Sequence, residues 1–283
     1  MQLTRYESAG EFLARAGDFL SAREAEHNLI LGISSRLQRE PILYGEPAYL
    51  ATVEDEGRVI GVTMRTPPHN LILSEIDDEA AIPLVLEDAR AVFDTLPGVV
   101  GPKAPVAEFA ELWQEATGTE AQLEIAQRCF RAEYVQAPPN VPGAMRVYEG
   151  RDRELAVEWM DAFVDEALHG PEPESSAEFV DRRDEDPDGG LVLWEDGGES
   201  VSMAGYGGRT PNGIRVGPVY TPPELRGRGY ASALTAALTQ RLLDEGRQFC
   251  FLFTDLANPT SNSIYQRIGY RPVIDVDLWR FSG

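Results

Sequence analysis

A short basic segment, Arg226-Gly227-Arg228-Gly229, stands directly before a stretch in which leucines recur at helical spacing. Residues 217–221, just upstream, are mostly apolar and predict a strand. The first N–H groups of a helix lack intrahelical partners and bind anions readily. Glycines allow the backbone to approach a ligand closely, and the arginines add local positive charge. This segment therefore predicts a site for a phosphate or pyrophosphate group.

The overall charge of the chain is opposite in sign to this segment. There are 47 acidic and 25 basic residues, giving a formal net charge of −22 at pH 7. Binding to nucleic acid or to an anionic membrane needs clustered Lys and Arg, so we expect neither as a partner. The negative charge fits a small cationic acceptor such as a polyamine, or it serves only solubility.

Length and composition point to a folded protein of more than one compact part. The 283 residues suffice for two domains, and the 43% hydrophobic content suffices for a core. Cys129 and Cys250 form neither a disulfide framework nor a zinc-binding pattern, so no metal is expected. The first twenty residues lack an apolar signal core, and no segment has the length of a membrane span, which predicts a cytoplasmic location.

Proline and glycine mark a boundary near the middle of the chain. The stretch "YVQAPPNVPGAM" predicts a linker at residues 136–144 between domains at 1–135 and 145–283. The two halves resemble each other, because residues 65–67 and 209–211 both read Arg-Thr-Pro and both join apolar segments as hairpin turns do. An acidic turn precedes each hairpin. We therefore expect a duplicated fold.

The second half has a regular order of elements. Helices are predicted at 153–168 and at about 175–186, the latter with a serine start, followed by three strands. After the basic segment, an amphipathic helix ends at Gly246, and the apolar run "FCFLF" suits a buried central strand. A short helix and a final strand complete the chain. The expected class is α/β (α+β), with a mixed, mostly antiparallel sheet in each half, flanked by helices.

Residues 226–231 match the pattern Arg/Gln-x-x-Gly-x-Gly/Ala, between a strand and a helix. Residues 258–272, "NPTSNSIYQRIGYRP", add an asparagine before a helix that carries a tyrosine and ends in Gly-Tyr. In this order the two motifs resemble the GNAT family of N-acetyltransferases, over about residues 144–283. The first half lacks such a loop, since "SEIDDEAAIP" is acidic and has no paired glycines. The resemblance thus implies an active second domain and a degenerate first one.

The resemblance also implies a reaction and its residues. An amine of the acceptor would attack the thioester of acetyl-CoA directly, and Tyr265 would be the general acid toward the leaving thiolate. The backbone N–H near Val219 would polarise the thioester carbonyl. Coenzyme binding would fall to a larger set: Val219, Tyr220, Thr221, Arg226, Gly227, Arg228, Gly229, Tyr230, Ala231, Asn258 and Ser261.

Several assignments stay open. Asn258 is also a good helix N-cap, and Ser261 is either a capping-turn residue or a coenzyme contact. The general base could be Asp255, Glu166 or an ordered water chain, and His169 could contact the acceptor. A non-catalytic acyl-CoA sensor or scaffold is the competing function, against which the presence of Tyr265 and Asn258 argues. The sequence identifies neither the acceptor nor the oligomeric state.

Overall fold

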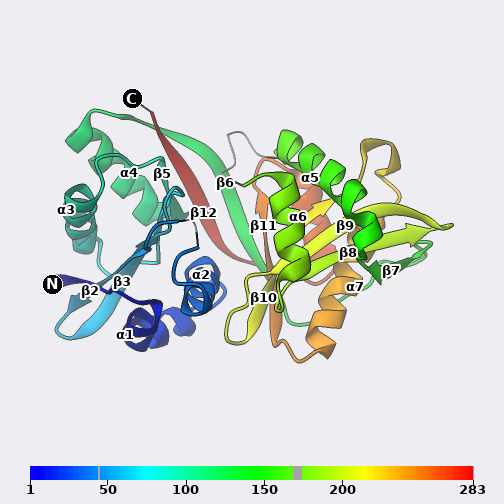
Figure 1. Cartoon of the computed structure of the whole chain (residues 1–283), viewed down its shortest axis with the longest axis horizontal. Coiled ribbons are helices and arrows are strands. Elements are labelled where there is room, and N and C mark those ends of the chain that lie inside the picture. Colours follow the sequence, from blue (N-terminus) through cyan, green and yellow to red (C-terminus); the bar gives the residue numbers. More distant parts are fainter. Residues whose placement is uncertain (44, 168–173, 283) are drawn as a thin grey trace. The chain divides into compact units, whose positions relative to one another are not determined.

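The computed structural model describes residues 1–43, 45–167 and 174–282 of the chain (Figure 1). They form two compact units. Unit 1 comprises 1–129, 255–257 and 273–283, and unit 2 comprises 130–254 and 258–272. Among the described residues, no helix is both long and apolar enough to cross a membrane.

The two repeats of the chain have the same order of elements, which confirms the expected duplication. The first repeat runs β1 (Gln2–Arg5), α1 (Ala9–Ala22), α2 (Asn28–Arg39), β2 (Tyr49–Asp55), β3 (Arg58–Arg65), β4 (Leu71–Leu73), the 3-10 turn η1 (Glu79–Ala81), α3 (Ile82–Val92), β5 (Gly98–Pro102), α4 (Lys103–Thr117) and β6 (Glu120–Ala132). The second runs β7 (Ala144–Val147), η2 (Gly150–Asp152), α5 (Arg153–Ala167), α6 (Ser176–Glu185), β8 (Gly190–Asp196), β9 (Glu199–Gly207), β10 (Gly213–Tyr220), η3 (Pro223–Leu225), α7 (Tyr230–Asp244), β11 (Phe249–Asp255), α8 (Pro259–Arg267) and β12 (Arg271–Ser282).

Each unit contains a mixed, mostly antiparallel sheet, as expected. In unit 1 the strand order is β1-β2-β3-β4-β5-β12, and the β4–β5 pair is parallel. In unit 2 the order is β11-β10-β9-β8-β7, and the β10–β11 pair is parallel. The Arg-Thr-Pro segments join β3 to β4 and β9 to β10, both of which are antiparallel pairs. The hairpin prediction is therefore correct in both repeats.

The sheet of unit 2 is covered on both faces because side chains alternate along each strand. Leu191 and Leu193 pack with α5 and α6, whereas Val192 between them packs with α7. On β10, Ile214 and Val216 belong to the α7 side. Figure 1 shows α5 and α6 lying side by side over one face of this sheet. Arg215, between Ile214 and Val216, accordingly belongs to the face covered by α5 and α6.

The last strand of the second repeat lies in unit 1. Val276–Arg280 of β12 pairs antiparallel with β5, while Phe130 and Ala132 at the end of β6 belong to the core of unit 2. The compact units therefore differ from the boundaries expected at 135 and 145. Local composition carries no signal for this difference, since it depends on which strands pair across a long sequence separation.

Candidate active site

Strands β10 and β11 pair along only part of their length. Their parallel register covers Gly213–Arg215 against Phe249–Phe251, although β10 continues to Tyr220 and β11 to Asp255. A bulge contributes to this arrangement, because Gly217 and Pro218 of β10 both stand opposite Gly205 of β9. The carboxyl half of β10 thus has backbone groups on its β11 side that this register leaves unpaired. An extended ligand could bind there as an added strand does.

Helix α7 begins immediately beyond this strand, at the glycine-rich segment. Its N-cap is Gly229, and no side chain caps the first turn. Gly227 and Gly229 have φ of 78° and 87°, in the left-handed region that favours glycine. A Cβ at Gly229 would lie 3.0 Å from Val141 Cγ2. The glycines therefore set the turn that leaves the first N–H groups of α7 available to an anion.

The side chain of Arg226 makes three contacts, with residues at the end of β10 and on α5. Its Nε donates to the Thr221 carbonyl at 2.8 Å, and its Nη2 donates to Glu166 Oε2 at 2.7 Å. The guanidinium also lies over the Tyr220 ring, with Cζ 5.7 Å from the centroid. Tyr220 Oη donates to the other Glu166 oxygen at 3.3 Å. Arg226 thus links the end of β10 to the end of α5.

Ser202 on the neighbouring strand β9 also holds the end of β10 in position. Its hydroxyl, fully buried, donates to the Tyr220 carbonyl at 2.9 Å and lies 2.8 Å from the Thr221 hydroxyl. Val219 is half-buried and packs against the α7-side core. These contacts orient the strand segment that leads into the glycine-rich turn. Ser202 was not predicted as a site residue from the sequence. The one feature that could have pointed to it is the presence of a polar residue within a mostly apolar strand.

The remaining residues of the turn have distinct roles. Arg228 Nη2 contacts the Glu224 carbonyl at 3.5 Å. Tyr230, the first residue of α7, is buried, and its hydroxyl donates to Asp196 at 2.6 Å. The pKa of Tyr230 is raised, chiefly by this hydrogen bond. Ala231 continues the first turn of α7. Asp196 belongs to the acidic "WEDGG" turn, so this turn anchors the helix.

Helix α8 is capped as expected. Asn258 Oδ1 accepts from the Ser261 N–H at 3.0 Å, with Pro259 at the first helical position. The Thr254 hydroxyl donates to Asn262 Oδ1, which ties α8 to β11. Both Asn258 and Ser261 are thus part of the cap.

Tyr265 lies on α8, half-buried against the α7-side core. Its ring meets that of Tyr270 edge-on, with centroids 6.1 Å apart. Within the part of the chain that the structure describes, no group hydrogen-bonds to the Tyr265 hydroxyl. Desolvation raises the pKa of this phenol to about 12. Among the described residues, the side chain is therefore a neutral O–H donor without a partner at physiological pH.

The candidate bases are placed differently from one another. Glu166 already accepts hydrogen bonds from Arg226 and Tyr220. Asp255 Oδ1 accepts from the Ala257 N–H at 2.7 Å, as in an Asx turn. His169 lies outside the described residues. Among the described residues, no group of three or more His, Cys, Asp or Glu side chains could hold a metal ion.

In the described part of the chain, the corresponding segment of unit 1 has neither parted strands nor a glycine-rich turn before its helix α3. Strand β4 ends at Leu73, and a Cβ at Gly101 of β5 would collide with the Leu73 carbonyl, so the two strands stay together. The segment that precedes α3 is acidic, and Asp78 caps η1 by accepting from the Ala80 N–H at 3.0 Å. An anion would meet carboxylates here. That the first repeat lacks the anion site stays a prediction.

Comparison with known proteins identifies the second repeat. Residues 153–270 match the model of the acetyltransferase (GNAT) family. A mycothiol acetyltransferase of Pseudarthrobacter chlorophenolicus is 33% identical over 174 residues, which is 58% of this chain and 50% of that protein. The chain therefore aligns with about half the length of this curated relative.

Solved structures show the fold of the whole chain. A GCN5-related N-acetyltransferase from Sphaerobacter thermophilus gives a TM-score of 0.61 at 17% identity, covering 98% of this chain and 95% of that one. A tandem GNAT protein from the clavulanic acid biosynthesis pathway gives 0.59 at 12% identity, covering 100% and 99%. The fold of the whole chain is that of these solved structures, and residues 153–270 carry the match to the GNAT acetyltransferase family.

Proposed function

We propose that the chain is an acetyl-CoA-dependent N-acetyltransferase acting on a small primary amine from unit 2. One observation supports this most strongly: the carboxyl half of β10, beyond its pairing with β11, runs directly into the glycine-capped N-terminus of α7. An extended pantetheine arm and a pyrophosphate need these two features in this order.

Binding of the coenzyme would depend mainly on backbone groups. The N–H groups of residues 226–231 would bind the pyrophosphate, and residues 219–221 would bind the pantetheine arm as a neighbouring strand does. The contact of Arg226 with Glu166 makes its side chain a support for the loop. Asn258 and Ser261 would contribute through the position of α8, which their capping bond sets.

The transfer itself forms a C–N bond and breaks the C–S bond of the thioester. The amine loses one proton, and the leaving thiolate accepts one. The backbone N–H near Val219 would stabilise the developing oxyanion, and the phenol of Tyr265 would donate to the thiolate.

The raised pKa of Tyr265 defines how it can act. A phenol of pKa about 12 is a weaker acid than an alkyl thiol such as cysteine, whose pKa is about 8.5, so complete transfer of its proton to the thiolate is unfavourable. It can donate a strong hydrogen bond that stabilises the thiolate as the C–S bond breaks. Since Glu166 is ion-paired, ordered water would carry the proton away from the amine, and the thiolate would take up a proton from water once the C–S bond has broken.

The family match and the named relative support only a broad class of acceptor. The relative is named for mycothiol, and the chain aligns with half of it, so a small amine is the extent of the proposal. The test is release of free thiol from acetyl-CoA in the presence of a panel of primary amines. Amine-dependent release with a matching N-acetyl product supports the proposal. Acetyl-CoA binding without product from any amine would favour the sensor.

A further inference from the structure

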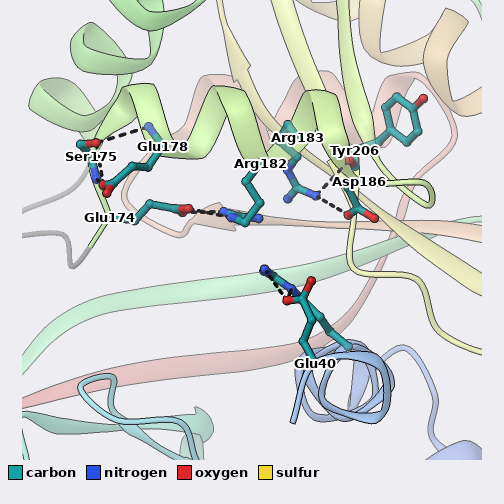
Figure 2. A network of polar contacts seen from close by, with 9 residues as sticks. Glu40, Glu174, Ser175, Glu178, Arg182, Arg183, Asp186 and Tyr206 are labelled. Atoms are coloured by element: carbon teal, nitrogen blue, oxygen red, sulfur yellow. Dashed lines mark hydrogen bonds and ion pairs between the residues drawn. The ribbon is translucent and has the colours of Figure 1, made fainter. Parts of the chain in front are cut away.

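Arg183, near the end of α6, is a buried cation with few partners. It is 4% exposed, and its Nε has no hydrogen-bond partner in the described structure. Its Nη1 donates to the Tyr206 carbonyl at 3.1 Å, and the nearest Asp186 oxygen lies 3.9 Å away. Figure 2 shows the guanidinium between these two groups, at the carboxyl end of α6. Buried donors are normally satisfied, so this one calls for a further acceptor.

Neighbouring charges on α6 do not supply that acceptor. Arg182 pairs with Glu174, which precedes the start of α6, through two hydrogen bonds of 2.5 and 2.6 Å. Ser175 and Glu178 cap the start of α6, as Figure 2 also shows. These acidic groups are therefore committed elsewhere.

A second arginine lies close to Arg183. Arg215 on β10 is paired across the strands with Gly207 of β9. A Cβ at Gly207 would collide with Arg183 Nη1, and a Cβ at Gly208 would lie 3.7 Å from Arg215 Nη2. The two guanidinium groups thus approach two consecutive glycines at the end of β9.

The electrostatics agree with this geometry. Burial is the main cause that lowers the pKa of Arg183, and the positive charge of Arg215 is the next. A guanidinium remains protonated in proteins, so a lowered pKa means that its charged form is destabilised. An anion bound between the two arginines would relieve both the desolvation and the repulsion.

The position of Arg215 connects this pair to the site. Arg215 is the last residue of β10 in register with β11, so it stands where the two strands begin to part. It alternates with Ile214 and Val216, which face α7, and therefore faces α5 and α6. The coenzyme would approach from the α7 end of β10. The arginines lie at the opposite end of the unpaired segment. A coenzyme arm that runs along this segment from α7 would carry its thioester toward that end, so the acceptor would meet the thioester on the side of the arginines.

We propose that Arg183 and Arg215 form an anion subsite for a carboxylate of the acceptor, which would then be an amino acid or a similar amine that carries a carboxylate. The assignment of the anion to the acceptor rests on the proposed function. The anion subsite itself rests only on the geometry of the two arginines. This assignment replaces the cationic acceptor that the net charge suggested, because the local charge at the site differs in sign from that of the whole chain.

Binding is tested first, without turnover. Arginine Nε–H resonances of the full chain are followed by NMR during titration with sodium propionate, and separately with propionamide, at constant ionic strength. We expect a saturable shift of the Arg183 resonance with propionate only, lost in Arg215→Gln. Arg209→Gln is the control, since Arg209 is exposed and pairs with Asp188. No saturable shift, or an equal shift with propionamide, would overturn the subsite.

Turnover is the second arm. Linear amino acids with two to six carbons are compared with the corresponding amino acid amides, in which a primary amide replaces the carboxylate and the amino group is kept. The quantity compared is kcat/KM for acetyl transfer. We expect the best carboxylate to exceed its amide by about tenfold or more, a difference of about 1.4 kcal/mol. Arg215→Gln should remove this preference through KM, and Arg215→Lys should retain part of it. Equal use of acid and amide by the unmodified chain would contradict the acceptor assignment.

The two arms separate the proposals. If acetyl-CoA does not bind but propionate shifts Arg183, the acetyltransferase proposal fails and the anion subsite stands. If acetyl-CoA and amines react but neither propionate nor the acid preference is seen, the acetyltransferase stands and the subsite is wrong. Because Arg183 packs against Gly207 and Phe179, its own substitution could impair folding, so Arg215 carries the test.

Discussion

The guanidinium of Arg226 donates to the Glu166 carboxylate at 2.7 Å, joining the first residue of the coenzyme motif to the end of α5. Both side chains are nearly half exposed, at 46% and 44%. An ion pair this exposed contributes at most about 1 kcal/mol to stability. Its main consequence is chemical, since it engages the guanidinium of Arg226 and the carboxylate of Glu166, one of the candidate bases.

Glu166→Gln tests whether Glu166 is that base. Removing a general base lowers kcat by about 10²–10⁴-fold, whereas loss of a supporting contact lowers it far less. We expect a decrease of less than about tenfold, because the carboxylate is engaged by Arg226 and Tyr220. The measurement is steady-state acetyl transfer with a saturating amine. A decrease of a hundredfold or more would make Glu166 the base.

Tyr265→Phe should separate catalysis from binding. The hydroxyl has no partner among described groups, so stability and acetyl-CoA affinity should hardly change, while kcat falls by about 10²-fold or more. Tyr270→Phe is the matched control. That hydroxyl is buried and lies 2.7 Å from the Thr239 hydroxyl, so its loss should cost about 1 kcal/mol of stability and leave kcat nearly unchanged. Unchanged kcat in Tyr265→Phe would contradict the role of this hydroxyl as a hydrogen-bond donor to the leaving thiolate.

Ser202→Ala tests the support beneath β10. The substitution leaves the Tyr220 carbonyl and the Thr221 hydroxyl without this buried partner, at a cost of about 1–3 kcal/mol. We also expect weaker acetyl-CoA binding, because the adjacent strand end would lose its orientation. Ser200→Ala on the same strand is the control, and urea unfolding with calorimetry measures both effects. Equal behaviour of the two variants would contradict the role of Ser202.

His27 in unit 1 should make stability depend on pH. It is buried, Nδ1 lies 3.2 Å from the Leu20 carbonyl, and Nε2 accepts from the Glu75 N–H at 3.3 Å. Desolvation is the main cause that lowers its pKa to about 4 from 6.5. The unfolded state therefore binds more protons between these values, so stability is full above pH 6.5 and is lost as the pH falls toward 4.

The native pKa of His27 lies about 2.5 below its value in the unfolded chain, which corresponds to a change of about 3 kcal/mol in the free energy of unfolding. The measurement is the imidazole Cε1–H titration by NMR, with unfolding free energies at several pH values for the unmodified chain and His27→Gln. We expect the stability advantage of the unmodified chain to decrease on acidification. A native pKa near 6.5 would contradict this account.

The order of elements and the local motifs were predictable from the sequence because they depend on neighbouring residues. Gly227 and Gly229 marked the turn, and Asn258 marked a cap that the structure confirms. The contacts of Arg226 with Glu166 and of Ser202 with Tyr220 join residues on different elements, and no local pattern encodes them. The same holds for the placement of β12 against β5. The roles of the site residues in catalysis remain predictions.

The central claim is that the turn before α7 binds acetyl-CoA, and calorimetric titration tests it most directly. Gly229→Glu adds a side chain at φ of 87°, brings a Cβ against Val141, and places a carboxylate at the helix N-terminus. Gly246→Glu is the matched control, with φ of 99° just past the other end of α7. We expect micromolar binding by the unmodified chain and by Gly246→Glu, and none by Gly229→Glu. Tight binding by Gly229→Glu, or no binding by the unmodified chain, would contradict the account.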